Sequence, residues 1–291
     1  MTTDRDQATS AGQEIAMIVE SHCHIIAPDQ QSYPRNLGPN PAAWVRDLSA
    51  EDFLDLITQA GVEKAILVQA FGAYRYDNRY VADAAARHPD RFAAVCIVDP
   101  LAPGACEQLD FWVKDKGVRG LRMVTWTEPP TLLDDARINP LWQRASELKI
   151  PVCVLTTFDQ VARLRPVLQR FPDLRLALDH LGMPRLSEEP QRNAQPLFDL
   201  AHFPNFYGKF SSWTIESLTR GGASACAEFF RRLLDSFGPD HLMWGSNFPA
   251  SNERSYRGFV ELAQEQLAFL STSERRWLFG DTALSLWPTL R

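Results

Sequence analysis

Ile18-Val-Glu-Ser-His-Cys-His-Ile-Ile26 is a short run rich in isoleucine and valine that carries two histidines two positions apart. This composition is typical of a buried strand, because β-branched residues pack well on a pleated surface. Side chains in a strand alternate between its two faces, so His22 and His24 should share one face and Cys23 should lie on the other. Two imidazoles on one face can bind a metal ion, contact a substrate oxygen or transfer a proton.

Seven further runs with the composition of buried strands follow along the chain. These strands are predicted over residues 64–70, 92–98, 118–124, 151–157, 174–180, 206–212 and 241–249. Helical signals separate them, such as the capping residue Ser49 before an apolar stripe that stops at Gly61. Further helices are predicted over 105–116, 139–149, 196–202 and 225–237, with one ending near His88, one capped by Asp159 and broken at Pro166, and one capped at Ser271.

This alternation predicts parallel strands joined by helical crossovers. Eight such units in 291 residues, without a linker-like break, predict an α/β fold with a single (β/α)8 TIM barrel over residues 17–291. A doubly wound open sheet is the alternative, but it needs a glycine-rich turn after the first strand, where this chain has Ile26-Ala-Pro-Asp29. The polar segment 1–16 is expected to be a flexible tail, and the proline-rich segment 27–48 is expected to fold over the C-terminal mouth of the barrel.

The composition argues against several classes of function. A net charge of −6 and the lack of a basic run argue against a nucleic-acid binder. No apolar run approaches the ~18 residues that a membrane helix needs, and the segment 1–13 lacks the apolar core of a signal peptide. The five cysteines are an odd number without Cys-x-x-Cys spacing, which favours a reduced, cytoplasmic protein. We therefore expect a small-molecule substrate, no nucleic-acid or membrane partner, and leave a homo-oligomer open.

Polar residues occur where several of the predicted strands end. In a (β/α)8 barrel the carboxyl ends of the strands meet at one mouth, which carries the active site. The residues predicted at this mouth are His22, His24, Tyr74, Asn78, Arg122, His180, Lys209 and Asn247. His180 is expected to share a strand face with Leu174, Leu176 and Leu178 and so to end an apolar row. We expect the three histidines among these residues to converge in one pocket.

Four motifs follow one another between residues 18 and 287, namely His22-x-His24, Leu178-Asp-His-Leu-Gly182, Trp244-Gly-Ser-Asn-Phe-Pro249 and Leu278-Phe-Gly-Asp-Thr-Ala-Leu-Ser-Leu-Trp287. Their order and spacing resemble the amidohydrolase superfamily, and within it the amidohydrolase-2 branch that contains sugar-acid and dicarboxylate lactonases. The run Gly117-Val-Arg-Gly-Leu-Arg122 is similar to that branch as well. The resemblance implies a hydrolase that acts on a lactone of a sugar acid or dicarboxylic acid, by hydrolysis or isomerisation, with the catalytic residues His22, His24, His180 and Asn247.

The chain departs from the family pattern at three positions. It has Asn247 where the general pattern has aspartate, Glu20 where aspartate is usual and Thr282 where asparagine is common. Some lactone-acting relatives, a lactone isomerase among them, carry asparagine at the first of these positions as well. The predicted fifth strand ends in Leu155-Thr-Thr157 without a histidine, which argues against a binuclear metal site. The resemblance therefore implies either that no cofactor is required or that a single divalent metal ion such as Zn²⁺ binds to His22, His24 and His180.

Hydrolysis of a lactone needs a polarised carbonyl, an activated water molecule and a proton donor for the ring oxygen. The three histidines can polarise the carbonyl, and one of them can act as the base because the ordinary histidine pKa of about 6.5 suits proton transfer. The pH profile is then expected to follow a group that titrates between about 6 and 7. Arg122 is expected to bind an anionic or hydroxyl-rich substrate, with a structural ion pair as the alternative, and Tyr74, Arg75, Asn78 and Lys209 are weaker candidates for substrate contacts.

Two other functions stay open from the sequence. A zinc-dependent decarboxylase or amide hydrolase is compatible with three histidines and a bound hydroxide, although the missing aspartate weakens it. A catalytically inactive barrel with a binding role is the second alternative, and the retained histidines argue against it. Metal analysis after purification in metal-free buffer tests the first alternative, and a turnover screen against aldonolactones tests the second.

Overall fold

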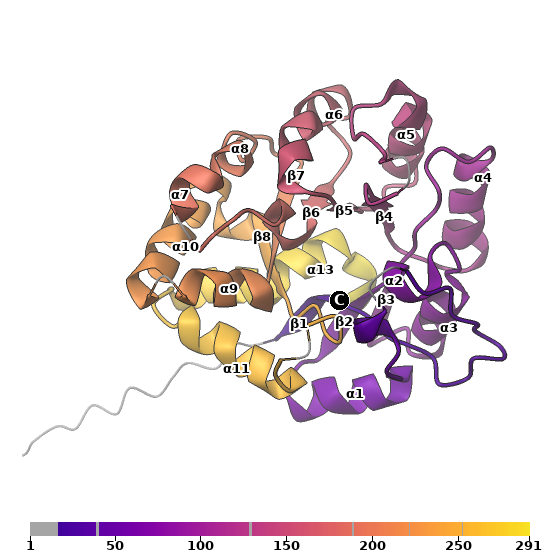
Figure 1. Ribbon diagram of the computed structural model, residues 1–291, viewed down its shortest axis with the longest axis horizontal. Coiled ribbons are helices and arrows are strands. Elements are labelled where there is room, and N and C mark those ends of the chain that lie inside the picture. Colours follow the sequence, from indigo (N-terminus) through magenta and orange to yellow (C-terminus); the bar gives the residue numbers. More distant parts are fainter. Residues whose placement is uncertain (1–16, 39–40, 128–129, 188, 221, 252) are drawn as a thin grey trace, which may run out of the picture.

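The structure, a computed structural model, describes residues 17–38, 41–127, 130–187, 189–220, 222–251 and 253–291. The segment 1–16, predicted to be a flexible tail, lies outside the described residues. Parallel strands form a ring that helices surround on the outside (Figure 1). The strands are β1 (Val19–Cys23), β2 (Lys64–Val68), β3 (Phe92–Val95), β4 (Leu121–Val124), β5 (Val152–Leu155), β6 (Leu176–Leu178), β7 (Phe206–Ser211) and β8 (Leu242–Gly245).

Two sets of main-chain hydrogen bonds close the ring. Strands β1 to β3 form one parallel sheet and strands β4 to β8 form another. Between β3 and β4, the Arg122 N–H donates to the carbonyl of Cys96 at 2.7 Å and the Cys96 N–H donates to the carbonyl of Gly120 at 3.0 Å. Where β8 meets β1, the Asn247 N–H donates to the carbonyl of His22 at 2.8 Å. The predicted (β/α)8 barrel is therefore confirmed, and the alternative of an open sheet is excluded.

The helices lie between the strands along the chain and outside them in space. They are α1 (Ala50–Gln59), α2 (Phe71–Tyr74), α3 (Arg79–Arg87), α4 (Ala105–Asp110), α5 (Asn139–Glu147), α6 (Leu164–Arg170), α7 (Pro190–Asn193), α8 (Gln195–Phe198), α9 (Ser212–Thr219), α10 (Ala223–Phe237), α11 (Tyr256–Gln266), α12 (Thr272–Arg276) and α13 (Thr282–Leu286). As predicted, Ser49 caps α1 by accepting a hydrogen bond from the Asp52 N–H at 2.9 Å. In the described part of the chain, none of these helices combines the length and the apolar character needed to cross a bilayer.

Three helix predictions differ from the structure at their ends. Asp159 does not cap a helix, since a 3₁₀ helix over Phe158–Arg163 precedes α6, which begins at Leu164. Pro166 does not break α6 but lies in its first turn. A proline fits there because the first N–H groups of a helix make no hydrogen bond within it. The helix predicted over 139–149 ends earlier, because α5 covers Asn139–Glu147. Helix α8 is shorter than the predicted helix over 196–202.

A β-bulge decides which face of β1 turns into the barrel. Val19 faces inward, and strict alternation would then turn Cys23 inward and His22 outward. The register with β2 shifts between Glu20 and Cys23, so that two residues of β1 lie opposite one residue of β2. The extra residue turns His22 and His24 into the barrel and places Cys23 in the core between strands and helices. The prediction that the two histidines share one face is therefore confirmed.

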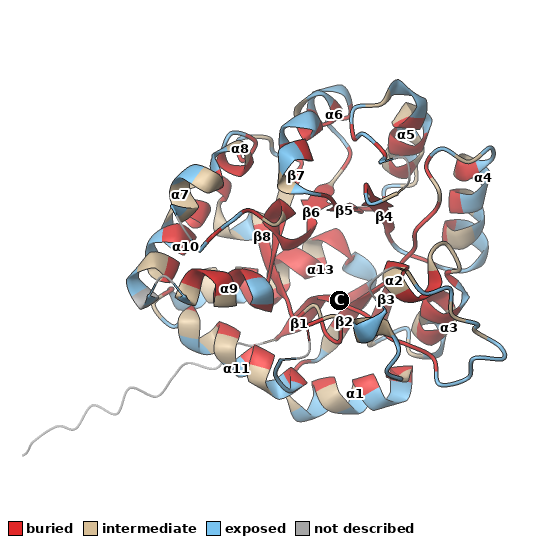
Figure 2. Cartoon of the chain, in the orientation of Figure 1, coloured by how far each residue is buried: buried red, intermediate tan, exposed pale blue. Residues whose placement is uncertain are grey.

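The C-terminal segment of the chain closes the N-terminal end of the barrel. Inward-facing residues of the strands pack there against α13 and the residues after it, in a cluster that includes Val19, Ile66, Ala93, Ala177, Met243, Ala283, Leu286, Trp287 and Leu290. Figure 2 shows that the strands are buried, whereas the surrounding helices expose their outer faces. Since apolar side chains fill this end, the polar residues that face inward lie toward the opposite end.

The described parts of the segment between β1 and α1, residues 24–38 and 41–49, lie over the C-terminal mouth, as predicted. An antiparallel bridge closes its base, where the Ile26 N–H donates to the carbonyl of Leu48 at 2.8 Å. Farther along, the Asn36 N–H donates to the carbonyl of Ala73 at 2.8 Å, which holds the segment against α2. These contacts place the side chain of Trp44 in the wall of the cavity at the barrel mouth.

We predict that Gly245→Ala destabilises the barrel at the junction of β1 and β8. A Cβ atom on Gly245 would lie 2.6 Å from Cβ of His22 and 2.8 Å from its main-chain nitrogen, so one of the two strands would have to move. The expected loss in the free energy of unfolding is about 1–3 kcal/mol, the usual cost of overpacking a core. Chemical denaturation measures this loss.

Gly258→Ala in α11 is the matched control, because the nearest atom to its added Cβ would be Ser255 Oγ at 3.3 Å. It should not lower the stability, since alanine favours a helix over glycine by up to about 1 kcal/mol. Equal stabilities of the wild type and Gly245→Ala would contradict the close approach of the two strands.

Candidate active site

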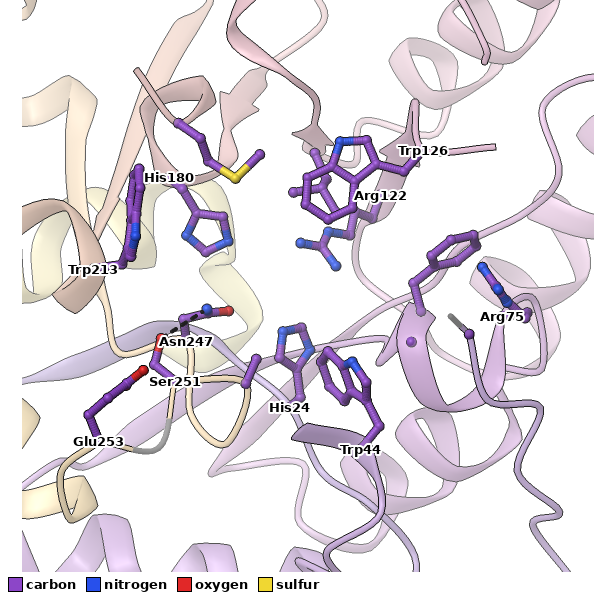
Figure 3. A pocket seen from close by; sticks show the side chains of 16 residues that line it. His24, Trp44, Arg75, Arg122, Trp126, His180, Trp213, Asn247, Ser251 and Glu253 are labelled. Carbon is purple, nitrogen blue, oxygen red and sulfur yellow. Dashed lines mark hydrogen bonds between the residues drawn. The ribbon is translucent and has the colours of Figure 1, made fainter. Parts of the chain in front are cut away.

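A cavity of about 410 Å³ opens at the C-terminal ends of the strands. His24, Arg122, His180 and Asn247 line it, and they come from the ends of β1, β4, β6 and β8. Figure 3 shows these four side chains around one common space, with Trp44 beside His24. A volume of this size lies in the range of pockets that bind small molecules. The mouth of the barrel is therefore the candidate active site.

The three predicted histidines lie together at this mouth. The ring centroids of His22 and His180 are 4.7 Å apart, and those of His22 and His24 are 5.1 Å apart. The predicted convergence is thus confirmed. His24 and His180 line the cavity, whereas His22 lies beneath it and is 1% exposed.

His180 reaches the cavity by a route that strand alternation does not predict. Strand β6 ends at Leu178, and both Leu176 and Leu178 pack outward against the helices, so alternation alone would turn His180 outward as well. Instead, His180 and Leu181 adopt left-handed backbone conformations, each with φ of 54°. This turn brings the imidazole back over the barrel mouth. The prediction that His180 continues the row of leucines is therefore wrong.

Sequence reasoning missed Asp179, although it lies in the motif that contains His180. Ala177 faces into the barrel, and residues two positions apart in a strand share a face. Alternation therefore places Asp179 on the inner face and could have identified it. Asp179 is fully buried, and its Oδ2 accepts a hydrogen bond from Nε of Arg122 at 2.8 Å. Its Oδ1 lies 3.2 Å from Nδ1 of His22 and 3.5 Å from Nζ of Lys209.

The buried cluster formed by Asp179, Arg122, Lys209 and His22 carries a net positive charge. Burial alone would raise the pKa of Asp179, but the neighbouring His22, Lys209 and Arg122 outweigh it and hold that pKa well below its usual range. Burial would lower the pKa of Lys209, but the adjacent Cys153 and Asp179 outweigh it and raise that pKa. One carboxylate therefore lies between two cations, which favours negatively charged atoms in the cavity.

Both ring nitrogens of His22 face protein groups. An arginine only donates hydrogen bonds, so Nε2 of His22, which lies 3.4 Å from Nη2 of Arg122, must be an acceptor. The ring proton is then on Nδ1, which faces Asp179. Burial lowers the pKa of His22 well below its usual value, so the ring is neutral. His22 has no nitrogen left for a substrate or a metal ion.

His24 and His180 are neutral imidazoles in the wall of the cavity. Nδ1 of His24 lies 2.8 Å from the carbonyl oxygen of Val68, which can only accept, so Nδ1 carries the proton and Nε2 is the free acceptor. Burial lowers the pKa of His24 to about 3 and the pKa of His180 to about 4. Both pKa values lie below the ordinary histidine range of about 6 to 7, because burial disfavours the charged imidazole.

Glu20, one of the departures from the family pattern, joins β1 to β8. Its Oε1 accepts hydrogen bonds from the N–H groups of His22 and Ser246 at 2.8 and 2.9 Å. Burial raises its pKa to about 7, and these hydrogen bonds oppose the rise only in part. Because the pKa of Glu20 is higher in the folded than in the unfolded state, protonation of its carboxyl favours folding. This stabilisation is complete below about pH 4.5 and is lost as the pH rises through 7. Thr282, another departure, is buried and donates a hydrogen bond to the carbonyl of Pro239 at 3.3 Å.

Asn247 follows β8 in a left-handed conformation with φ of 62°, which asparagine adopts more readily than most residues. Its Nδ2 donates to Oγ of Ser251 at 3.2 Å. The amide can donate and accept hydrogen bonds, but it cannot act as a base as an aspartate could. Asn247 thus presents an amide to the cavity and cannot supply a base there.

Three residues predicted to bind substrate do not line the cavity. The hydroxyl of Tyr74 accepts a hydrogen bond from the Ala27 N–H at 2.7 Å. The side-chain amide of Asn78 exchanges two hydrogen bonds with the main chain of Ile97, at 2.7 and 2.8 Å. Lys209 is buried below the cavity, beside Asp179. Tyr74 and Asn78 hydrogen-bond to main-chain groups, and Lys209 pairs with Asp179 and donates a hydrogen bond to Cys153. The geometry therefore supports a structural role for all three residues and does not support substrate contact.

Three tryptophans line the cavity and were not found from the sequence. Trp44 lies beside His24, with the two ring centroids 5.2 Å apart. Trp126 follows β4 and is 48% exposed, and Trp213 lies in α9 and is 38% exposed. Trp126 and Trp213 lie two residues beyond the ends of β4 and β7, which was the available signal for these two. Arg75, a weaker candidate from the sequence, also lines the cavity.

Comparisons with known proteins agree with this architecture. The family model described as Amidohydrolase matches residues 19–289. L-fucono-1,5-lactonases from Burkholderia ambifaria and Burkholderia multivorans are 26% and 28% identical to this chain, over 74% and 92% of it and over 75% and 95% of their own lengths. A solved protein described as a 2-pyrone-4,6-dicarboxylic acid hydrolase, from Pseudomonas putida, has a TM-score of 0.76 at 23% identity, covering 94% of this chain and 98% of that one, and shows the fold. A solved amidohydrolase from Burkholderia multivorans with bound zinc is 25% identical and has a TM-score of 0.70, covering 94% of this chain and 99% of that one.

The residues of this site do not fit a metal ion, although a related structure holds zinc. A metal ion needs the lone pairs of several imidazoles or carboxylates directed at one position. Nε2 of His22 faces the guanidinium of Arg122, whose positive charge repels a cation. Asn247 offers an amide where the general pattern has a carboxylate. Across the described ranges, no three His, Cys, Asp or Glu side chains are arranged to hold a metal ion, so the geometry does not support the predicted set of His22, His24 and His180.

We predict that Asn247→Asp raises the affinity for zinc by about tenfold or more, equivalent to ~1.4 kcal/mol. The substitution adds an anionic oxygen to a wall that His24 and His180 already line. Zinc content after equilibrium dialysis measures the change. Asn139→Asp, at the start of α5 and away from the cavity, is the matched control. If both variants bind as little zinc as the wild type, residue 247 does not face the two histidines and the placement of the site is wrong.

Proposed function

The chain belongs to the amidohydrolase family, and on that premise we propose that it hydrolyses a lactone of a sugar acid. Two relatives that are named as lactonases support this substrate class. The observation that carries the proposal is the neutral imidazole of His24 in the wall of a cavity that also holds the cation of Arg122. Such a pair supplies a base for water and attracts the oxygen that becomes negative in the reaction.

In the proposed reaction, a water molecule gives one proton to Nε2 of His24 while its oxygen attacks the carbonyl carbon of the lactone. The carbonyl oxygen becomes negative in the tetrahedral intermediate. The bond between this carbon and the ring oxygen then breaks, and the imidazolium of His24 returns the proton to the ring oxygen. The product is the open-chain hydroxy acid. Nε2 of His24 is free to accept this proton because the carbonyl of Val68 fixes the ring proton on Nδ1.

The remaining walls of the cavity suit a hydroxylated ring. Asn247 and Ser251 present polar side chains, and Trp126 and Trp213 present aromatic faces at the mouth. The hydroxyl groups of a sugar lactone can pair with the amide and hydroxyl, while its C–H face rests on an indole ring. The proposed partner is therefore a small molecule, and a homo-oligomer stays a prediction.

We also propose a cytoplasmic location. All five cysteines belong to the described residues and are free thiols, and four of them are buried. Free thiols are typical of proteins in reducing compartments.

The same base could serve an isomerase, in which a hydroxyl of the substrate attacks in place of water. Turnover of an aldonolactone panel in H₂¹⁸O separates the two reactions, because only hydrolysis puts ¹⁸O into a new carboxylate. A zinc-dependent decarboxylase or amide hydrolase is not favoured, since the site does not fit a metal ion. Lack of turnover for every lactone in the panel would contradict the proposed function and favour a binding role.

We predict that His24→Gln lowers kcat/KM for the lactone by about 10²–10⁴-fold, the usual contribution of a general base. In the wild type, kcat/KM should stay level as the pH falls from about 7 to about 5. The pKa of His24 is lowered to about 3, so the unprotonated base persists over this range. A histidine with the ordinary pKa of about 6.5 would lose its activity there.

Profiles of kcat/KM against pH test this assignment. His202→Gln is the matched control, because His202 is an exposed histidine outside the cavity. A wild-type profile that falls on the acid side with a midpoint between about 6 and 7, the ordinary histidine range, would show that His24 is not the base.

A further inference from the structure

We propose that the guanidinium of Arg122 polarises the lactone carbonyl, and that Asp179 and His22 are positioning residues that aim it. The inference rests on the proposed function and names the electrophile of that reaction. It also explains why the site does not need a metal ion, because the guanidinium of Arg122 polarises the carbonyl as a metal ion would.

Two contacts fix the orientation of the planar guanidinium. Nε of Arg122 donates to Oδ2 of Asp179 at 2.8 Å, and Nη2 lies 3.4 Å from Nε2 of His22. These donors share one edge of the guanidinium, so Nη1 and the second hydrogen of Nη2 remain for a ligand. Within the described ranges Nη1 has no protein hydrogen-bond partner, and Arg122 lines the cavity. The remaining donors of Arg122 are therefore directed at the space that a substrate would fill.

The carboxylate that aims Arg122 is itself held from two sides. Oδ1 of Asp179 lies 3.2 Å from Nδ1 of His22 and 3.5 Å from Nζ of Lys209. Lys209 is fixed in turn, since its Nζ donates to Sγ of Cys153 at 3.0 Å. Asp179 and Lys209 are almost completely buried, so water does not compete for these contacts. Asp179 thus cannot turn away from Arg122 without leaving a cation unpaired.

This arrangement gives His22 a different role from the catalytic one expected from the sequence. Nδ1 of His22 faces Asp179, and Nε2 accepts from Arg122. Neither nitrogen is available to a substrate. The neutral ring therefore connects the carboxylate to the guanidinium and keeps the two groups at a fixed distance.

A guanidinium held in this way suits the transition state of lactone opening. Negative charge develops on the carbonyl oxygen when water attacks, and a charge-assisted hydrogen bond from Arg122 strengthens at that moment. The cation is already oriented, so it does not have to reorganise during the reaction. After the ring bond breaks, the same cation faces the carboxylate of the product. The step consumes only water and lactone.

The kinetic test compares substitutions of Arg122. Arg122→Lys keeps the charge but loses the planar fork, and we expect kcat to fall by about 10²–10³-fold, the usual effect of removing an oxyanion donor, with a much smaller change in KM. Added guanidinium should restore part of the activity of Arg122→Ala but none of the activity of His24→Gln. Arg119→Ala, an exposed arginine just before β4, is the matched control and should keep the wild-type kcat. A wild-type kcat in Arg122→Lys would overturn the inference.

The positioning role of His22 is tested by two substitutions. His22→Gln keeps an acceptor for Arg122, whereas His22→Leu removes it. We expect kcat to be lower in His22→Leu than in His22→Gln, with similar KM values. Equal kcat values in the two variants would show that His22 does not act through Arg122.

A spectroscopic test does not depend on turnover. In protein labelled with ¹⁵N-histidine, the His22 ring is assigned by the loss of its signals in His22→Gln. We expect a neutral ring with its proton on Nδ1, and no change when zinc is added. A proton on Nε2, or signals that shift with zinc, would overturn the placement of Arg122 against His22.

These outcomes separate the inference from the function on which it rests. If no lactone is turned over, the proposed function fails, and the spectra still decide how Arg122 and His22 are arranged. If a lactone is hydrolysed at the wild-type kcat by Arg122→Lys, the proposed function stands and this inference fails.

Discussion

The buried ion pair between Asp179 and Arg122 is the interaction on which the mouth of the barrel depends. Asp179 is fully buried and Arg122 is 3% exposed, so each charge needs the other. Removing one partner of such a pair leaves an uncompensated charge, at a cost of about 3–5 kcal/mol. The two residues come from the ends of β6 and β4, and Lys209 adds a second cation from β7. The contacts that hold these strands together therefore also fix the cation of the active site.

The junction of β1 and β8 meets a different constraint. There the carboxylate of Glu20 accepts hydrogen bonds from main-chain N–H groups of both strands, and Gly245 lets the backbone of β8 approach His22 closely. The N–H of Asn247 donates to the carbonyl of His22, and the N–H of His24 donates to the carbonyl of Phe248. Main-chain contacts thus set the distance between the proposed base and the amide opposite it, although Asn247 lies beyond the end of its strand.

The fold could be predicted because each strand is an apolar run between turn residues, and because the first strand is not followed by the glycine-rich turn of an open doubly wound sheet. The side-chain directions were less predictable. Alternation shows that His22 and His24 share a face, but a bulge decides that this face is the inner one, and the sequence has no glycine or proline there to mark it. His180 converges with them through a left-handed turn at His180 and Leu181, two residues that do not favour this conformation. Asn78 was misjudged because its amide pairs with the main chain.

The charge of the nearby guanidinium explains why an amide at position 247 suits this site better than a carboxylate. Asn247 and Arg122 line one cavity, so an ionised aspartate at 247 would attract the guanidinium and offset its charge. With an amide there, the positive charge that Asp179 leaves uncompensated stays available to the carbonyl oxygen of a substrate. A metal ion has the opposite requirements, since it needs the carboxylate and is repelled by the guanidinium. The buried arginine and the amide are therefore consistent with each other in a site that uses an organic cation, and replacing either one alone breaks that match.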